Sequence, residues 1–244
     1  MNKIDKLKEM IDECENIVFF TGAGVSTDSG LKDFRSKDGL YNERYLYPPE
    51  YMLSSSCFYE HTEEFYEFYR EKFNCLDALP NNTHKLIKVL EDIGKVNGII
   101  TQNIDGLHSK AGSKNVFEIH GTIYKNHCIK CNKKYDAKYV FGCSDVPKCT
   151  CGGIIKPDVI LYGEMLPNDA YMKGLTAIDK ADMLIVCGSS LTVYPAASMI
   201  ESFAGKYLVI INNDKTLYDA KADLVINDNL SKTSLKLLNY YEKS

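Results

Sequence analysis

Short apolar blocks that recur along the chain constrain its fold more than any other feature. Each block is rich in β-branched residues and nearly continuous, which is typical of strands buried on both faces of a parallel sheet. Helical patterns lie between several blocks, so the alternation predicts an open α/β sheet with right-handed crossovers. The predicted strands are residues 17–20, 96–101, 116–120, 159–162, 183–187, 207–211 and 224–226, and the predicted helices are residues 2–15, 84–93, 169–180 and 196–203.

Two stretches interrupt this alternation. Residues 38–80 are aromatic-rich with a mostly helical pattern, and residues 125–155 hold most of the cysteines. Because both lie inside the α/β sequence, we expect them to be insertions that form a second, smaller domain. Residues 1–37, 81–124 and 156–244 would then form the larger domain. Ligands of open α/β sheets bind at the carboxyl ends of the strands, so we expect the functional site between the two domains.

The charge of the chain excludes some classes of function. Its 244 residues carry a net charge of −4, with a pI near 5.8, and lysines are interspersed with acids, so there is no basic footprint for nucleic acid. Residues 1–17 carry frequent charges, and no run approaches the ~18 apolar residues of a membrane span. We therefore expect a soluble, cytoplasmic protein that binds neither nucleic acid nor a membrane.

The nine cysteines need a role other than a full set of disulfides, because the number is odd and the cytosol is reducing. A C-x-x-C pair followed by a C-x-C pair matches two hairpin knuckles that converge on one tetrahedral ion, and four thiolates suit a closed, structural zinc site. The second knuckle is one residue tighter than usual, so Cys143 or His127 could replace a ligand. A redox-active CxxC or loose thiols are the alternatives to zinc. The predicted ligands are Cys128, Cys131, Cys149 and Cys151.

A glycine turn follows the first predicted strand. Gly22, Ala23 and Gly24 would let the backbone approach a pyrophosphate, with the N-terminus of a following helix facing its charge. The turn departs from the dinucleotide fingerprint, because Thr27 replaces the third glycine and no strand ending in an acid follows about 20 residues later. A plain tight turn without a ligand is the alternative.

Two further turns of small or polar residues follow predicted strands. Gly188, Ser189 and Ser190 come after the strand MLIVC, and Asn212, Asn213 and Asp214 come after YLVII. Amide and carboxylate groups at the carboxyl end of a strand can bond the hydroxyls of a ribose, although an Asn-rich turn is the simpler interpretation of the second segment. Three such turns at one sheet edge are harder to explain by chance than one.

Polar groups also end the predicted strands 96–101 and 116–120. The first leads into Gln102, Asn103, Ile104 and Asp105, and the second ends at His120. A lone histidine is usually a surface residue or a satisfied core residue. Here it precedes a glycine at a strand end, and a neutral imidazole near pH 7 is the natural general base for a sugar hydroxyl.

These motifs together resemble the sirtuins, which are NAD-dependent protein-lysine deacylases. The resemblance runs from about residue 16 to residue 226. It comprises GAGVSTDSGLKDFR, TQNIDGLH, EIHGT, the four-cysteine ribbon, KPDVILYGEMLP, CGSSLTVYPAAS and INND, in the family's order. It implies a Rossmann-like parallel sheet domain that binds NAD, with a smaller lobe made of the helical insertion 38–80 and the zinc ribbon 125–155.

The resemblance implies a role for each matched residue. His120 would be the catalytic base, Asn103 and Asp105 would stabilise the charge that develops on the ribose, and nicotinamide would leave as the acyl group passes to ADP-ribose. An extended acyl-lysine peptide would bind as an added strand. The NAD-binding residues would be Gly22, Ala23, Gly24, Thr27, Asp33, Phe34, Arg35, Gln102, Asn103, Ile104, Asp105, His120, Gly188, Ser189, Ser190, Asn212, Asn213 and Asp214. The residues that contact the peptide would be Val159, Tyr162, Gly163, Glu164 and Val193.

The sequence departs from the family's pattern at several places. Lys32 replaces a proline, which should loosen the loop that carries Asp-Phe-Arg, and YGE replaces FGE, so Tyr162 stands for a phenylalanine. Deacylases for acidic acyl groups carry a Tyr-x-x-Arg pair, whereas this chain has Tyr69 and Lys72. A lysine cannot form the bidentate fork to a carboxylate, so we favour acetyl and neutral acyl groups.

Other functions share parts of this pattern. A mono-ADP-ribosyltransferase shares the first chemical step, and a non-catalytic NAD-binding or zinc-ribbon interaction module would lack the base that His120 provides. A hydride-transfer dehydrogenase is disfavoured by the absent acid after a second strand. The sequence specifies neither the protein substrates nor the oligomeric state.

Overall fold

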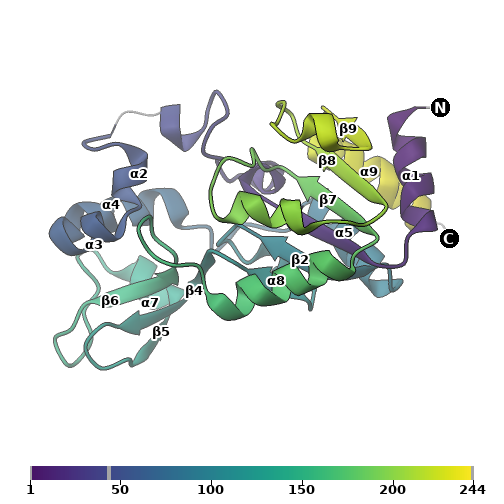
Figure 1. Ribbon diagram of the computed structural model, residues 1–244. Helices are drawn as coiled ribbons and strands as arrows, with labels where there is room; N and C mark the ends of the chain where they lie inside the picture. The colour runs from purple at the N-terminus through teal and green to yellow at the C-terminus, as the bar shows by residue number, and fades with distance from the viewer. Residues whose placement is uncertain (1, 43–44, 243–244) are drawn as a thin grey trace.

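A six-stranded parallel sheet forms the centre of the larger lobe (Figure 1). The computed structural model describes residues 2–42 and 45–242. The strands follow the order β3-β2-β1-β7-β8-β9, and every neighbouring pair is parallel. The strands are β1 (Ile17–Thr21), β2 (Val96–Thr101), β3 (Val116–Glu118), β7 (Met183–Cys187), β8 (Tyr207–Ile211) and β9 (Leu224–Ile226).

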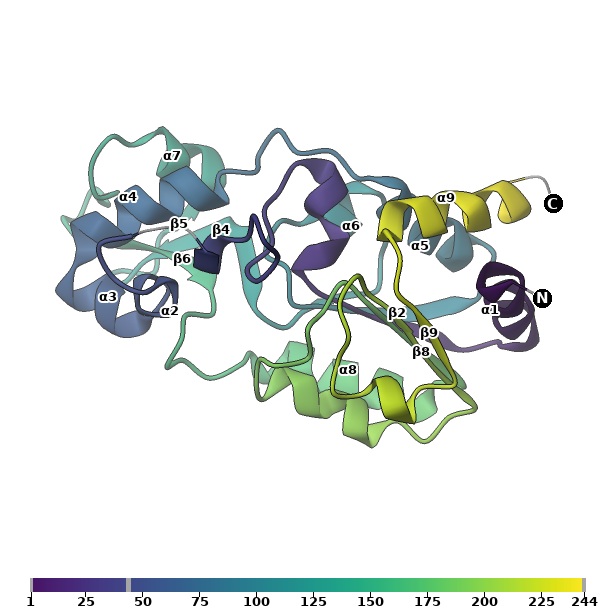
Figure 2. The same cartoon turned by 90° about the horizontal axis from the view of Figure 1, so that it is seen from above.

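Helices cover both faces of this sheet, as the view from above shows (Figure 2). In β1, Ile17 and Phe19 pack with α1 (Lys3–Glu13), α5 (Asn82–Asp92) and α9 (Leu230–Tyr241). Val18 and Phe20 point to the other face, where they pack with α8 (Asn168–Lys180) and a 3₁₀ helix over residues 196–202. The continuous apolar character of the strands therefore reflects burial on both sides, as predicted.

The helices predicted for the larger lobe begin and end within two residues of their predicted limits, except that residues 196–202 form a 3₁₀ helix, whereas α6 (Leu107–Lys110) and α9 were not predicted. Side-chain caps define the first turns of α1, α5 and α9. The amide oxygen of Asn2 accepts from the backbone N–H groups of Ile4 and Asp5 at the start of α1. At α5, Asn81 and His84 form a reciprocal capping box. The short helix α6 follows β2.

The smaller lobe combines the two predicted insertions around one apolar core (Figure 1). Its helices are α2 (Pro49–Met52), α3 (Ser55–Glu60), α4 (Thr62–Phe73) and α7 (Ala137–Gly142), and its antiparallel sheet has the order β5-β4-β6, with β4 (Gly121–Cys128), β5 (Lys134–Asp136) and β6 (Ile155–Val159). The core is unusually aromatic: Phe58, Phe65, Tyr66 and Tyr69 are almost completely buried. The aromatic residues of the helical insertion thus cover the sheet of the cysteine-rich insertion.

One predicted strand is wrong. Residues 159–162 do not form a strand of the parallel sheet, because Val159 ends β6 of the smaller lobe and the chain continues as a loop. The backbone N–H of Ile160 donates to His120 O (2.9 Å), so the segment does run beside the end of the predicted strand 116–120. The predicted domain limits at 124/125 and 155/156 fall inside β4 and at the first residue of β6.

Among the described residues, no helix combines the length and the apolar character that crossing a bilayer requires.

Candidate active site

A cavity of about 350 Å³ lies where the carboxyl ends of β1, β2, β7 and β8 face loops of the smaller lobe. It is lined by every residue for which the sequence predicted contact with the cosubstrate or with the peptide. Those residues are Gly22, Ala23, Gly24, Thr27, Asp33, Phe34, Arg35, Gln102, Asn103, Ile104, Asp105, His120, Val159, Tyr162, Gly163, Glu164, Gly188, Ser189, Ser190, Val193, Asn212, Asn213 and Asp214.

The glycine turn interlocks with the turn after β7. Backbone N–H groups of Gly22 and Gly24 donate to Cys187 O (3.0 Å) and Gly188 O (2.9 Å). A Cβ at Gly24 would lie 2.8 Å from the Cα of Gly188, and a Cβ at Gly22 would lie 2.8 Å from the carbonyl oxygen of Gly188. The neighbouring turn therefore already requires both glycines, whatever ligand they approach.

The helix expected after this turn is not an α-helix. Residues 23–25 and 27–29 form two separate 3₁₀ helices of three residues each. The N-terminus facing the cavity is therefore a single tight turn, and its dipole is much smaller than that of a long helix. Any charge on a phosphate in this cavity would be met by individual N–H groups rather than by a macrodipole.

A buried network connects the glycine turn to the segment after β2. Asn103 Nδ2 donates to Gly22 O and to Ser26 Oγ, each at 3.1 Å, and Ser26 Oγ donates to Asp105 Oδ2 at 2.6 Å. The other Asp105 oxygen accepts from the N–H of Leu107 (2.9 Å). Burial raises the pKa of Asp105 above its ordinary value, and these two hydrogen bonds oppose the shift. The network fixes both side chains against the wall of the cavity.

His120 lies between the two sheets of the protein. Its Nδ1 is 3.0 Å from Gln102 O, and because a carbonyl oxygen only accepts, Nδ1 carries the hydrogen and Nε2 retains a lone pair. Burial lowers the pKa of His120 below its ordinary value, so the imidazole is neutral at pH 7. The next residue, Gly121, has φ +75°, and a Cβ there would lie 2.0 Å from Asp158 O. Only glycine fits this turn, which aims the histidine into the cavity.

Other polar side chains that line the cavity also have partners within the protein. Gln102 Nε2 donates to Ser189 Oγ (2.8 Å), and Asn212 Nδ2 donates to Asp214 O (2.9 Å). The Asp33 carboxylate accepts from the backbone N–H groups of Arg35 (3.1 Å) and Ser36 (2.8 Å), so it shapes its own loop.

The loop 160–164 is anchored at two points. The carboxylate of Glu164 accepts from the N–H of Leu161 (2.9 Å) and from Nζ of the buried Lys156 (3.1 Å). The backbone of Tyr162 bonds Leu53 O (2.9 Å) and the N–H of Ser55 (3.0 Å).

These anchors restrict how a peptide strand could pair with the loop. Glu164 is committed to holding the loop, and the backbone of Tyr162 is committed to the helical insertion. Among the hydrogen bonds between described residues, none uses the N–H or C=O of Gly163. That residue therefore presents the backbone groups with which an added strand could pair.

Four cysteine sulfurs come together at the tip of the smaller lobe. All lie within 4.8 Å of one another, and three of the pairs are 3.4 to 3.6 Å apart. A tetrahedron with bonds of about 2.3 Å has edges of about 3.8 Å, so the donor set Cys128, Cys131, Cys149 and Cys151 fits structural zinc. Neither alternative ligand joins it, because His127 pairs with Asp158 and Cys143 donates to Tyr139 O.

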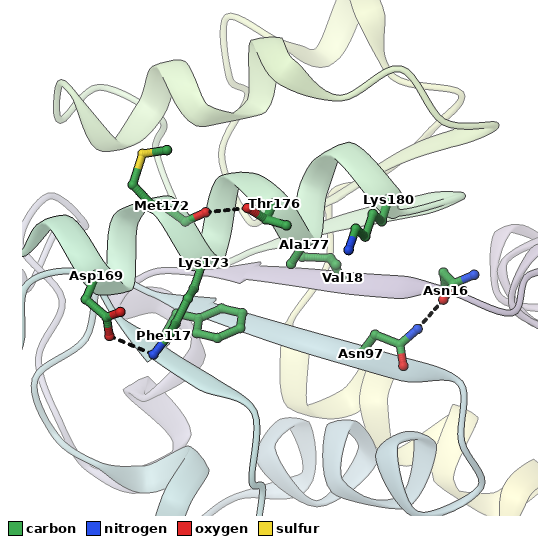
Figure 3. Close-up of a pocket in the computed structure, with 10 residues that line it drawn as sticks. All are labelled: Asn16, Val18, Asn97, Phe117, Asp169, Met172, Lys173, Thr176, Ala177 and Lys180. Carbon is green, nitrogen blue, oxygen red and sulfur yellow. Dashed lines mark hydrogen bonds and ion pairs between the residues drawn. The ribbon is translucent and has the colours of Figure 1, made fainter.

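A second hollow lies on the α8 side of the sheet (Figure 3). Its volume is about 450 Å³, and it is an open groove between α8 and the strands. Asp169 pairs with Lys173 (2.7 Å) at one end, and Asn16 pairs with Asn97 at the other. These polar side chains pair with one another instead of converging on a common point, so the groove has no feature of a catalytic site.

Comparison with known proteins agrees with this geometry. The sequence profile of the Sir2 family matches residues 22–195. The chain belongs to the Sir2 family. Two similar proteins, each named NAD-dependent protein deacetylase, come from Clostridium acetobutylicum and Clostridium perfringens. Each is 51% identical, over 236 and 242 residues, which is 95% and 98% of this chain and 96% and 99% of the relatives.

Solved Sir2 structures have the same fold as this chain. One, described as Sir2 with a p53 peptide and NAD+, is 37% identical, covers 100% of both chains and has a TM-score of 0.87. Another, with a deacetylated p53 peptide and 3'-O-acetyl-ADP-ribose, is 37% identical, covers 98% of both chains and has a TM-score of 0.91. The predicted family and fold class are thus confirmed.

Three residues with roles in this Sir2-family site were not found from the sequence. Ser26 bridges Asn103 and Asp105, Lys156 holds Glu164, and the Tyr41 hydroxyl lies 2.7 Å from that of Tyr162. Ser26 lies inside the first motif, so its small polar side chain among glycines was an available signal. The other two roles depend on how the loop 160–164 folds, for which one sequence offers no signal.

Proposed function

We propose that this chain is an NAD-dependent protein-lysine deacetylase. In the proposed reaction the acyl-lysine carbonyl oxygen displaces nicotinamide from NAD, and the acyl group ends on ADP-ribose. Membership of the Sir2 family and 51% identity to proteins named for this activity support the proposal. The observation that carries it is a neutral, partly buried His120 whose Nε2 is left as an acceptor in the cavity that all the predicted NAD and peptide contacts line.

The residues divide into groups along the cavity. We assign the phosphates of NAD to residues 22–24 and Thr27, the nicotinamide ribose to residues 33–35, and the nicotinamide pocket to residues 102–105. The adenosine half is assigned to residues 188–190 and 212–214. This order is supported by the position of the three turns on the adjacent strands β1, β7 and β8.

The chemistry is assigned to three side chains. His120 accepts the proton of a ribose hydroxyl, which then attacks the carbon of the transferred acyl group. Asn103 and Asp105 present oriented dipoles and charge to the ribose carbon from which nicotinamide leaves. Their burial supports this role, because fixed polar groups act more strongly where water is excluded.

Burial also raises the pKa of the nearby Cys75 to about 12, so this thiol is not a nucleophile at pH 7.

The peptide is assigned to the gap between Gly163 and Val193, where it would pair as an added strand. Such pairing reads the backbone of the substrate more than its side chains. Val159 and Tyr162 line the route of the acyl-lysine into the cavity, and Glu164 holds the loop.

Acetyl and neutral acyl groups are the proposed cargo. Lys72 lies 2.7 Å from Glu71, and its ammonium is 5.3 Å from the centre of the Tyr45 ring. An ammonium that is engaged in this way, without the planar fork of an arginine, is a poor receptor for an acyl carboxylate.

We also propose that residues 1–37, 81–124 and 156–244 are the NAD-binding domain and that residues 38–80 and 125–155 are insertions that form the small domain. Separate apolar cores in the two lobes support the division. We propose a cytoplasmic location, supported by nine free thiols, four of which need to remain reduced to bind a metal.

The test replaces the base. We expect His120→Ala to lose at least about a hundredfold in deacetylation of an acetyl-peptide, the usual contribution of general-base catalysis, while NAD binding by calorimetry survives. His61→Ala is the matched control, because His61 lies among tyrosines of the helical insertion and does not line the cavity. Unaltered activity in His120→Ala would overturn the assignment. Transfer of label from NAD to protein without deacetylation would instead favour a mono-ADP-ribosyltransferase.

A further inference from the structure

The loop 33–42 forms one wall of the cavity and is held mainly by itself. Leu40 N–H donates to Asp33 O (2.9 Å) and Tyr41 N–H donates to Phe34 O (2.8 Å), so the loop closes as a compact turn. A Cβ at Gly39 would lie 2.7 Å from the carbonyl carbon of Phe34, which shows how tightly the two arms pack. The internal bonds fix the shape of the loop but not its position over the cavity.

A single hydrogen bond joins this loop to the rest of the described chain. Among the hydrogen bonds between described residues, only the contact between the hydroxyls of Tyr41 and Tyr162, at 2.7 Å, leaves residues 33–42. The other attachments are apolar: the Phe34 ring lies 6.4 Å from that of Phe73 on α4, and Leu40 is buried.

Tyr162 is a firm anchor for that bond. Its backbone is bonded on both sides to the helical insertion through Leu53 and Ser55, and the following turn is pinned by Glu164 and Lys156. Burial, and next the bond to Tyr162, raise the pKa of Tyr41, so the Tyr41 hydroxyl keeps its proton. One hydrogen bond between two hydroxyls thus ties the loop 33–42 to an anchored residue.

We propose that the Tyr41–Tyr162 hydroxyl pair is a latch that holds the 33–42 loop over the cavity, and that Tyr162 is thereby a positioning residue for NAD. The inference rests on the proposed function for its ligand. Tyr162 stands where the family's motif has a phenylalanine, so this substitution supplies the hydroxyl that completes the latch. A loop held in place before the ligand arrives loses less conformational freedom on binding.

The first arm of the test needs no ligand. Tyr41→Phe and Tyr162→Phe remove one hydroxyl each and keep both rings, including the edge-on contact of Phe34 with Tyr41 (5.5 Å). We expect amide hydrogen exchange in residues 33–42 to accelerate about two- to tenfold in each variant, the factor that corresponds to one neutral hydrogen bond. Tyr241→Phe is the control, because Tyr241 bonds Asp12 (2.9 Å) between α9 and α1, far from the cavity residues. Unchanged exchange in both variants overturns the latch.

The second arm measures NAD binding by calorimetry. We expect each single variant to raise the Kd for NAD about two- to tenfold, and the double variant to be no weaker than either single variant. A merely structural role would not produce equal, non-additive effects confined to NAD. Additive effects, or parental NAD affinity in both variants, overturn the proposal. If exchange in residues 33–42 is slower in the parent than in the two variants but the parent does not deacetylate the peptide, the proposed function fails and the latch stands.

Discussion

The zinc site offers a prediction whose size follows from the geometry. Cys131 is exposed, whereas Cys128 and Cys149 belong to the core of the smaller lobe. Replacing Cys131 by serine therefore removes a ligand without opening a cavity. Cys143→Ser is the matched control, because Cys143 is a thiol of the same ribbon that bonds Tyr139 O and takes no part in the cluster.

The expected loss of zinc affinity follows from dividing the binding free energy of the metal equally among its four ligands. Structural zinc in small finger domains contributes about 10–16 kcal/mol, and the four sulfurs here are similarly spaced, so each supplies about 2.5–4 kcal/mol. Cys131→Ser should therefore weaken zinc binding about a hundred- to a thousandfold. The ribbon has few other sources of stability: β5 is three residues long, and beside the two cysteines the aliphatic side chains that it adds to the shared core are the buried Val140 and Ile155 and the partly buried Val146 and Ile154.

The assay is a zinc competition with a chromogenic chelator, combined with elemental analysis and a thermal melt. We expect about one zinc per chain in the parent and in Cys143→Ser, and a lower melting temperature and reduced deacetylation in Cys131→Ser. Parental zinc affinity in Cys131→Ser would refute the four-thiolate site. Loss of zinc with full activity would refute the idea that the ribbon supports His120 through β4 and β6.

Two further predictions concern stability. Burial lowers the pKa of His84 to about 4, so the unfolded chain binds more protons than the folded one between pH 4 and 6.5. Keeping His84 neutral therefore contributes about 3 kcal/mol to the free energy of unfolding above pH 6.5, and this contribution is lost as the pH falls towards 4. His84→Gln, which can keep the capping box, should show a flatter pH dependence in urea denaturation, and an identical slope would contradict this. Gly24→Ala should cost about 1–3 kcal/mol, because its Cβ would meet the backbone of Gly188 at 2.8 Å; Gly142→Ala, with nothing within 4 Å, is the control, and equal melting temperatures for the two would refute the clash.

The strands of the larger lobe were predictable because each is buried on both faces. The failure at residues 159–162 has a physical cause. Val159 and Leu161 are buried, so the run reads as a strand of the main sheet, but they pack in the core of the smaller lobe. Apolar periodicity reports burial and cannot report which core a residue enters.

The parts of the candidate site formed by the turns that directly follow strands were predictable. Those three turns follow β1, β7 and β8, which are neighbours in the sheet, so they meet at one edge. The reason for the glycines was only partly predictable. The sequence suggested approach to a pyrophosphate, whereas the structure adds the backbone of Gly188 as a neighbour that tolerates no Cβ. The roles of Lys156 and Tyr41 were not predictable, because each depends on how the loop 160–164 folds, which brings Glu164 onto Lys156 and Tyr162 against Tyr41.

The position of His120 explains why the smaller lobe interrupts the larger one at this point of the chain. The residue before it, Ile119, donates to Thr101 O of β2, while the carbonyl of His120 accepts from Ile160 beside β6. The next residue begins β4, which pairs with Val159. His120 is thus held by the parallel sheet on one side and by the ribbon sheet on the other. A change in the angle between the lobes must move this residue relative to the turns that line the cavity, so damage to the distant metal site should reach the chemistry through two continuous strands.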